Sequence, residues 1–114
     1  MSDCLFCKMI EGAIKPDIVF ENEQVLAFRD INPQAPVHVL VVPKQHISTL
    51  NDLDDHHSEL VGQMYLAAQQ VARQTGIAEG GYRTVMNCNA DAGQTVFHIH
   101  LHVLGGRIMS WPPG

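Results

Sequence analysis

The sequence predicts an α+β fold with an antiparallel sheet, because helical and strand-like segments follow one another with short connections. The predicted order is a short helix, three strands, a long helix and two further strands. Parallel βαβ units would need longer crossovers than these connections provide. The chain has 114 residues, 46% of them apolar, which is enough for one domain with its own core. We therefore expect a single domain over residues 1–114.

The first element is a short helix over residues 3–11. Ser2 or Asp3 can cap its start, and Gly12 can end it. Its apolar side chains recur at helical spacing and form one stripe: Leu5, Phe6, Met9 and Ile10.

Three strands are predicted next. Residues 18–21 and 25–28 are apolar runs joined by three polar residues, which indicates a hairpin. Residues 32–36 form a loop, because neither of its prolines fits a central strand. Residues 37–42 form a strongly apolar strand that Pro43 ends.

The second half begins with a long helix, which Asn51 or Asp52 can cap and which runs toward Gly76. Strands are then predicted over residues 82–87 and 97–104. The apolar face of the helix comprises Leu53, Leu60, Val61, Met64, Ala67, Ala68, Val71 and Ala72.

Composition excludes several classes of protein. A net charge of −5 argues against a general nucleic-acid binder, although a small anionic ligand is compatible with it. No apolar run approaches the ~20 residues of a membrane span, and the N-terminus does not resemble a secretory signal. Three cysteines do not make a disulfide framework. We expect a cytoplasmic protein that binds neither nucleic acid nor membranes.

The strand over residues 97–104 carries the strongest functional signal, because His98, His100 and His102 alternate with aliphatic residues. Side chains of a strand point alternately to opposite faces, so the three imidazoles share one face about 7 Å apart. The other face would pack on the core through Phe97, Ile99, Leu101 and Val103. A row of imidazoles suggests nucleophilic chemistry, proton transfer or metal binding, and the alternative is a strand whose polar face is histidine by chance.

Several separated motifs resemble the histidine triad family, and in particular its Hint branch of purine nucleoside phosphoramidases. The motifs are Asp30-Ile31-Asn32-Pro33-Gln34-Ala35-Pro36-Val37-His38, Pro43-Lys44-Gln45-His46-Ile47, Gly93-Gln94-Thr95-Val96-Phe97, the three alternating histidines with Leu104-Gly105-Gly106-Arg107, and Trp111-Pro112-Pro113-Gly114. The resemblance spans nearly the whole chain. It implies an antiparallel sheet of about five strands flanked by helices, and a homodimer whose two sheets join.

The same resemblance implies roles for three histidines. His100 would attack the α-phosphorus of a nucleoside phosphoramidate or an aminoacyl-adenylate and form a nucleotidyl-histidine, which water then hydrolyses. Neutral imidazole suits this role, because it is a good nucleophile near pH 7. His102 would contact the phosphate or move a proton to the leaving group, and His38 would support the triad from the neighbouring strand.

The resemblance also implies a binding site for the nucleotide. Gly93, Gln94 and Thr95 would supply amide and hydroxyl donors to the phosphate, and Asn87 an amide donor to the phosphate or leaving group. Asp30 would accept hydrogen bonds from the ribose hydroxyls. The walls of the base pocket would be Leu5, Phe6, Met9, Phe28 and Ile31, although plain core packing is the favoured explanation for each of these residues taken singly.

Cys4-x-x-Cys7 forms half of a tetrahedral metal site. Some relatives complete such a site with histidines like His46 and His98, so the resemblance implies a structural zinc ion that the chemistry itself does not need. The alternatives are two cysteines packed as small apolar residues and a thiol redox pair.

Three other functions remain open. Histidines on one strand can hold a catalytic zinc ion, which would make the protein a metal-dependent enzyme. Within the family, dinucleoside polyphosphate hydrolysis is the alternative, although the tail from Trp111 points to the Hint branch. In relatives this tail lies near the active site across the dimer, where it can tune leaving-group preference. The third alternative is a non-enzymatic nucleotide-binding module.

Overall fold

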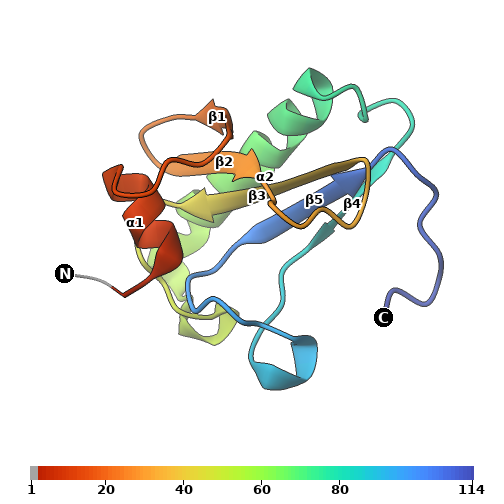
Figure 1. Cartoon of the computed structure of the whole chain (residues 1–114). Coiled ribbons are helices and arrows are strands. Elements are labelled where there is room, and N and C mark those ends of the chain that lie inside the picture. The colour runs from red at the N-terminus through yellow and green to blue at the C-terminus, as the bar shows by residue number, and fades with distance from the viewer. Residues whose placement is uncertain (1–2) are drawn as a thin grey trace.

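The computed structural model describes residues 3–114 and confirms the α+β fold with an antiparallel sheet (Figure 1). Five strands lie in the order β1-β2-β3-β5-β4, and every neighbouring pair is antiparallel. The strands are β1 (Ile18–Glu21), β2 (Val25–Arg29), β3 (Val37–Pro43), β4 (Tyr82–Val85) and β5 (Leu101–Gly105). The predicted hairpin over residues 18–28 is confirmed by the pairing of β1 with β2.

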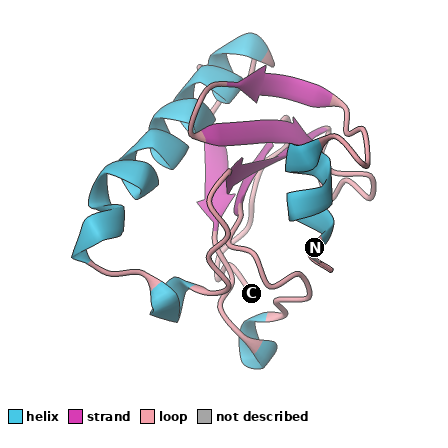
Figure 2. Ribbon diagram, turned by 90° about the vertical axis from the view of Figure 1, so that its left-hand side faces the viewer, coloured by secondary structure: helices cyan, strands magenta, loops and turns pink. Residues whose placement is uncertain are grey.

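Two helices cover opposite faces of this sheet. Figure 2 shows the strands between the long helix α2 (Ser58–Gln74) and the short helix α1 (Leu5–Glu11). Alternate residues of β2 and β3 divide between two apolar clusters, so that Val39 and Val41 pack with α2 while Leu40 and Val42 pack with α1. Burial on both faces explains why residues 37–42 are apolar at almost every position.

The prediction that one long helix begins at Asn51 or Asp52 was wrong. Two single 3-10 turns, η1 (Leu50–Asp52) and η2 (Asp55–His57), precede α2, which begins at Ser58. Each turn has its own capping box, in which the Thr49 or Asp54 side chain accepts a backbone N–H group and begins the turn. Leu53 lies between the turns with extended dihedral angles and packs against the core from outside the helix.

Helix α1 begins two residues later than predicted. Cys4, and not Asp3, is its N-cap, since the Cys4 sulfur accepts the backbone N–H of Cys7 at 3.4 Å. The alternative cap, Ser2, lies outside the described residues. Gly12 ends the helix as predicted, with φ of 88°.

The last two strands are shorter than predicted. β4 ends at Val85, and β5 begins at Leu101, so residues 97–100 lie outside the ladder. The register pairs Val41 with Leu101 and would pair Pro43 with Ile99, but proline has no N–H group to continue the ladder. The N–H of Ile99 instead donates to the Ile47 carbonyl at 2.7 Å.

This early end of the ladder changes the predicted faces of the histidine segment. Phe97 is 48% exposed and does not pack on the core as expected, whereas Ile99, Leu101 and Val103 do. No helix within residues 3–114 is long and apolar enough to cross a membrane.

Candidate functional site

A cavity of about 700 Å³ opens beside α1, between the end of β2 and the histidine segment. Nine of the predicted site residues line it: Leu5, Phe6, Met9, Phe28, Asp30, Ile31, Thr95, His100 and His102. Its lining is mainly apolar, and it also contains charged and polar groups, namely the imidazoles of His100 and His102, the carboxylates of Asp17 and Asp30, and the side chains of Lys15 and Arg29. A mainly apolar lining with a few polar groups is the composition expected of a small-molecule site.

His38 is buried and does not line the cavity, but it contacts two residues that do, His102 and Asp30. The backbone N–H of Gln34 donates to His38 Nδ1 at 3.0 Å, so in the neutral ring the proton lies on Nε2. That Nε2 is 2.9 Å from His102 Nδ1 and 3.5 Å from a carboxylate oxygen of Asp30. His38 therefore donates to His102 Nδ1, which places the proton of neutral His102 on its own Nε2.

The orientation of His100 follows from a different backbone group. Its Nδ1 is 2.8 Å from the His98 carbonyl oxygen, which can only accept, so Nδ1 carries the proton. The lone pair of His100 therefore lies on Nε2, as an attacking imidazole requires. The His100 and His102 rings are neighbours, with centroids 5.0 Å apart.

Burial keeps these imidazoles neutral. Desolvation lowers the pKa of His38 and of His100, and the nearby Asp30 carboxylate opposes it only in part. For His102, desolvation together with the neighbouring His100 and His38 lowers the pKa to about 4. At neutral pH the site thus holds one ring with a lone pair on Nε2 and a neighbouring ring with an N–H group.

Four residues from three distant segments form a second cluster, and one of them is His98, the first of the three alternating histidines. His98 Nε2 donates to the Pro43 carbonyl at 2.8 Å, which leaves its Nδ1 as a lone pair. That Nδ1 lies 3.1 Å from His46 Nδ1, 3.4 Å from Cys4 Sγ and 3.6 Å from Cys7 Sγ. Cys7 Sγ is also 3.3 Å from His46 Nδ1.

These distances fit the edges of a tetrahedral metal site. Zinc bonds of ~2.0–2.1 Å to nitrogen and ~2.3 Å to sulfur give edges of about 3.3 Å for N–N and about 3.6 Å for N–S. The buried His98 also donates its second nitrogen to a carbonyl, as metal-bound histidines do. Cys4, Cys7, His46 and His98 can therefore hold a metal ion.

Asp30, His38 and His102 also lie within ligand distance of one another, but their chemistry does not suit a metal. A metal-bound histidine donates its remote N–H, whereas the remote nitrogen of His38 accepts the N–H of Gln34. The His38 atom that faces the other two residues therefore carries a proton where a ligand needs a lone pair. This arrangement argues against a catalytic metal among these three residues.

Four predicted substrate-binding residues do not line the cavity: Asn87, Gly93, Gln94 and Trp111. The Gln94 side chain is buried, donates to the Ser48 and Val96 carbonyls at 2.9 and 3.1 Å, and accepts the N–H of Asn89 at 2.8 Å. Its own N–H donates to the Asn89 carbonyl, so Gln94 holds the loop and directs no amide group at the cavity.

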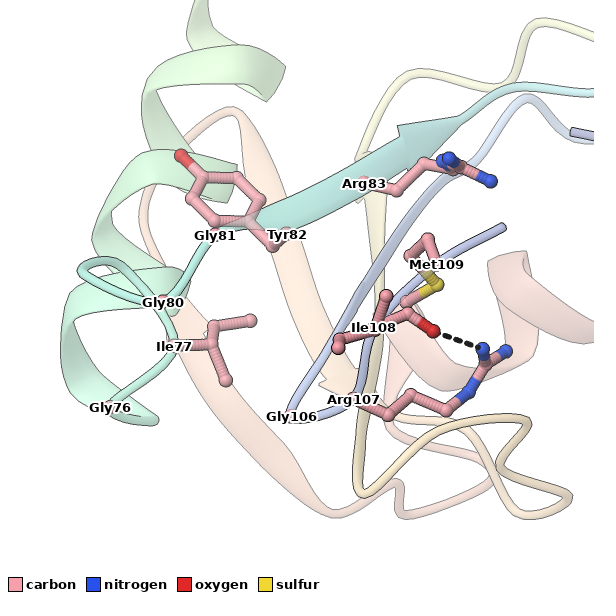
Figure 3. A pocket seen from close by; sticks show the side chains of 10 residues that line it. All are labelled: Gly76, Ile77, Gly80, Gly81, Tyr82, Arg83, Gly106, Arg107, Ile108 and Met109. Atoms are coloured by element: carbon pink, nitrogen blue, oxygen red, sulfur yellow. Dashed lines mark hydrogen bonds between the residues drawn. The ribbon is translucent and has the colours of Figure 1, made fainter. Parts of the chain in front are cut away.

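Trp111 is 80% exposed and lies under the guanidinium of Arg83, at 5.9 Å from its ring centre. A separate cavity of about 530 Å³ lies nearby, between the turn after α2 and residues 106–109 (Figure 3). It contains none of the predicted site residues. Arg107 at its rim donates to the carbonyls of Ile108 and Gln34.

One group that sequence reasoning missed is the backbone N–H of Gln34. It sets the tautomer of His38, and Arg107 holds the same loop by donating to the Gln34 carbonyl at 3.1–3.2 Å. A backbone donor leaves no trace in residue type. The repeated prolines around it, at positions 33 and 36, were the available sign of a loop with a defined shape.

Comparison with known proteins identifies similar chains. A family model described as HIT domain matches residues 11–109. The purine nucleoside phosphoramidase of Escherichia coli K12 is 49% identical over 105 residues, covering 92% of this chain and 88% of that protein. An uncharacterised HIT-like protein of Synechococcus elongatus is 50% identical over 112 residues, covering 98% of this chain and 97% of that protein.

Solved structures agree with these sequence matches. A HIT family hydrolase from Legionella pneumophila superposes with a TM-score of 0.96 at 54% identity, covering 98% of this chain and 100% of that one. A HIT family hydrolase from Clostridium thermocellum gives a TM-score of 0.94 at 45% identity, covering 96% of each chain.

Proposed function

The protein belongs to the HIT domain family and is a hydrolase, and we propose that it cleaves the P–N bond of purine nucleoside 5′-phosphoramidates. Aminoacyl-adenylates, with a P–O bond at the same phosphorus, are a second substrate class for the same chemistry. One observation carries the proposal: a buried imidazole, His100, lines the cavity with its Nδ1–H bonded to a carbonyl and its Nε2 lone pair available. The 49% identity to a named phosphoramidase supports this substrate class.

The proposed reaction has two steps. In the first, His100 Nε2 bonds to the α-phosphorus while the P–N bond breaks, the leaving nitrogen takes a proton from solvent, and the His102 Nε2–H group donates a hydrogen bond to a phosphoryl oxygen. In the second, water attacks the phosphorus, the bond to His100 breaks, and the proton that the water loses returns to solvent. Nucleoside monophosphate and amine are released, and both histidines regain their starting protonation.

The remaining polar groups would bind the nucleotide. Asp30 lines the cavity, its side chain accepts the N–H of Asn32 at 2.8 Å, and its carboxylate would accept hydrogen bonds from the ribose hydroxyls. Thr95 is exposed at the cavity and would donate its hydroxyl to the phosphate. The base would lie against the apolar wall that Leu5, Phe6, Met9, Phe28 and Ile31 form.

Zinc is the metal we propose for the cluster of Cys4, Cys7, His46 and His98. Two thiolates and two imidazoles at tetrahedral spacing suit this ion. When bound, the ion would cross-link α1 to the histidine segment without touching the substrate. The chemistry therefore belongs to the histidines, which distinguishes this proposal from a metal-dependent hydrolase.

A homodimer is the assembly we propose, with two sheets joined edge to edge. β4 is one edge of the sheet, and it carries the half-exposed Tyr82. Arg83 on the same strand stacks on Trp111, so the C-terminal tail starts from this edge. Joining two copies here would carry Trp111 toward the partner's cavity. Sedimentation of the purified protein tests the dimer, and a monomer at micromolar concentration would exclude it.

The deciding experiment is hydrolysis of adenosine 5′-phosphoramidate with intact-mass detection of the adduct. Wild type should turn over and carry an adenylyl group, and a folded His100→Ala variant should do neither. His56→Ala is the matched control, because the His56 side chain is 93% exposed and remote from the cavity lining. Undiminished turnover in His100→Ala would exclude His100 as the nucleophile, and binding of AMP without turnover in wild type would favour a nucleotide-binding module.

A further inference from the structure

Helix α1 forms one wall of the cavity, and it is too short to be stable without contacts to the rest of the fold. It has seven residues, and isolated helices shorter than ~12–15 residues are marginal in water. Leu5, Phe6 and Met9 of this helix line the cavity. The shape of the cavity therefore depends on what ties α1 to the rest of the fold.

The metal cluster supplies one of those ties. Cys4 caps α1 and Cys7 lies in its first turn, so both thiols of the cluster belong to this helix. The two imidazoles of the cluster, His46 and His98, come from the segments that flank the sheet. A metal held by all four groups would fix the distance between α1 and the histidine segment.

Phe6 lies between the two cysteines in sequence and touches both sites. Its buried ring meets the His98 ring edge to face, with centroids 5.8 Å apart, and meets the His100 ring in the same way at 5.0 Å. It also packs on Phe28 of the cavity wall at 5.5 Å. Any shift of α1 would thus move one ring that contacts a cluster histidine, the proposed nucleophile and the base-binding wall.

The cluster is also open to exchange. A cavity of about 500 Å³ is lined by Cys4 and His46, and the His46 side chain is exposed. Metal could therefore enter and leave without unfolding of the sheet. The apolar core between the sheet and α2 contains neither Cys4 nor Cys7, so it does not depend on the metal.

We propose that metal occupancy of the Cys4–Cys7–His46–His98 cluster and nucleotide binding in the main cavity are energetically coupled through Phe6. This inference rests on the proposed nucleotide site and goes beyond it, because it makes affinity for the nucleotide depend on a metal that never contacts it. Coupling between binding sites is reciprocal, so bound nucleotide must tighten metal binding by the same factor. We expect a factor of about ten, within the usual range for such coupling.

Two titrations test the coupling. Calorimetry measures AMP affinity in zinc-loaded and metal-depleted protein, and competition with a chromophoric chelator measures zinc affinity with and without saturating AMP. Both should give the same factor of about ten. Equal AMP affinity in the two forms would overturn the proposal. Absence of AMP binding even in the zinc-loaded form would instead refute the proposed function.

Two variants test whether the coupling passes through Phe6. Phe6→Leu should reduce the coupling factor to near one while zinc still binds, because the ring that joins the two sites is gone. Phe20→Leu is the matched control on the opposite face, where Phe20 packs with the α2 cluster, and it should retain the full factor. Far-UV circular dichroism of the metal-depleted protein completes the test. A global loss of structure there, or full coupling in Phe6→Leu, would overturn the local route through Phe6.

Discussion

The tautomer of His102 should depend on His38, and two substitutions can separate the bonds that His38 makes. An asparagine at position 38 places its oxygen near the former Nδ1, where it can still accept the N–H of Gln34. A glutamine places its NH₂ near the former Nε2, where it can still donate to His102 Nδ1. His38→Asn therefore keeps the loop bond, and His38→Gln keeps the bond to the cavity.

The expected magnitudes follow from the two bonds. A neutral hydrogen bond of ordinary length contributes about 0.5–1.5 kcal/mol, and 1.4 kcal/mol is tenfold in rate. His38→Asn should thus lower kcat/KM by about twofold to twelvefold, while His38→Gln, which keeps this bond, should lower it by less than about twofold. Because Gln34 is exposed, water can replace the lost loop bond in His38→Gln, and stability should fall by only about 0.5–1 kcal/mol.

Steady-state hydrolysis of adenosine 5′-phosphoramidate and urea unfolding give the two magnitudes. Long-range ¹H–¹⁵N correlation spectra of histidine-labelled protein read the tautomers directly, and His102 should carry its proton on Nε2 in wild type and in His38→Gln. A wild-type His102 protonated on Nδ1 would refute the reasoning at its first step. Equal losses of kcat/KM in the two variants would refute the assignment of the donor.

Four further outcomes are expected. The pKa of His102 is lowered from the ordinary value of 6.5 to about 4, so between these two pH values the unfolded chain binds more protons than the native one. The free energy of unfolding should therefore fall as pH drops through this window, by no more than about 3 kcal/mol. Urea unfolding at a series of pH values should show that this free energy depends less on pH in His102→Gln than in wild type. Gly105→Ala should destabilise the protein by about 1–3 kcal/mol in thermal unfolding, because its Cβ would lie 2.7 Å from the Ile77 Cδ1 atom, and an unchanged Tm would show that Ile77 can move aside. Cys7→Ser should lose stoichiometric zinc in metal analysis of protein purified without a polyhistidine tag, whereas retained zinc would remove Cys7 from the ligands. Deletion of the residues after Met109 should change the relative kcat/KM of phosphoramidates with different amines more than it changes Tm, and unaltered selectivity would exclude a role for the tail.

Much of the fold could be predicted from residue order. Apolar alternation and turn residues were enough to predict the hairpin, the apolar strand and the α+β class, because these features depend on neighbours in sequence. The errors had one local cause and one distant cause. Capping boxes at Thr49 and Asp54 divided the start of the long helix, and Pro43, a neighbour of Ile99 only in the sheet, ended the histidine ladder early.

The same division holds for the site. Sequence by itself determined which residue types are present and at what spacing: three alternating histidines, a Cys-x-x-Cys pair and a loop bounded by prolines. Only the folded structure decided which nitrogen of each ring carries a proton, because that choice belongs to the backbone group that folding places against the ring, four residues away for His38 and 55 residues away for His98. The carbonyl of Pro43 leaves His98 with a lone pair for the metal cluster, and the N–H of Gln34 leaves His38 with a proton for His102. Similar side chains thus become a ligand in one place and a donor in the other, since an imidazole takes its tautomer from the partner that folding brings to it.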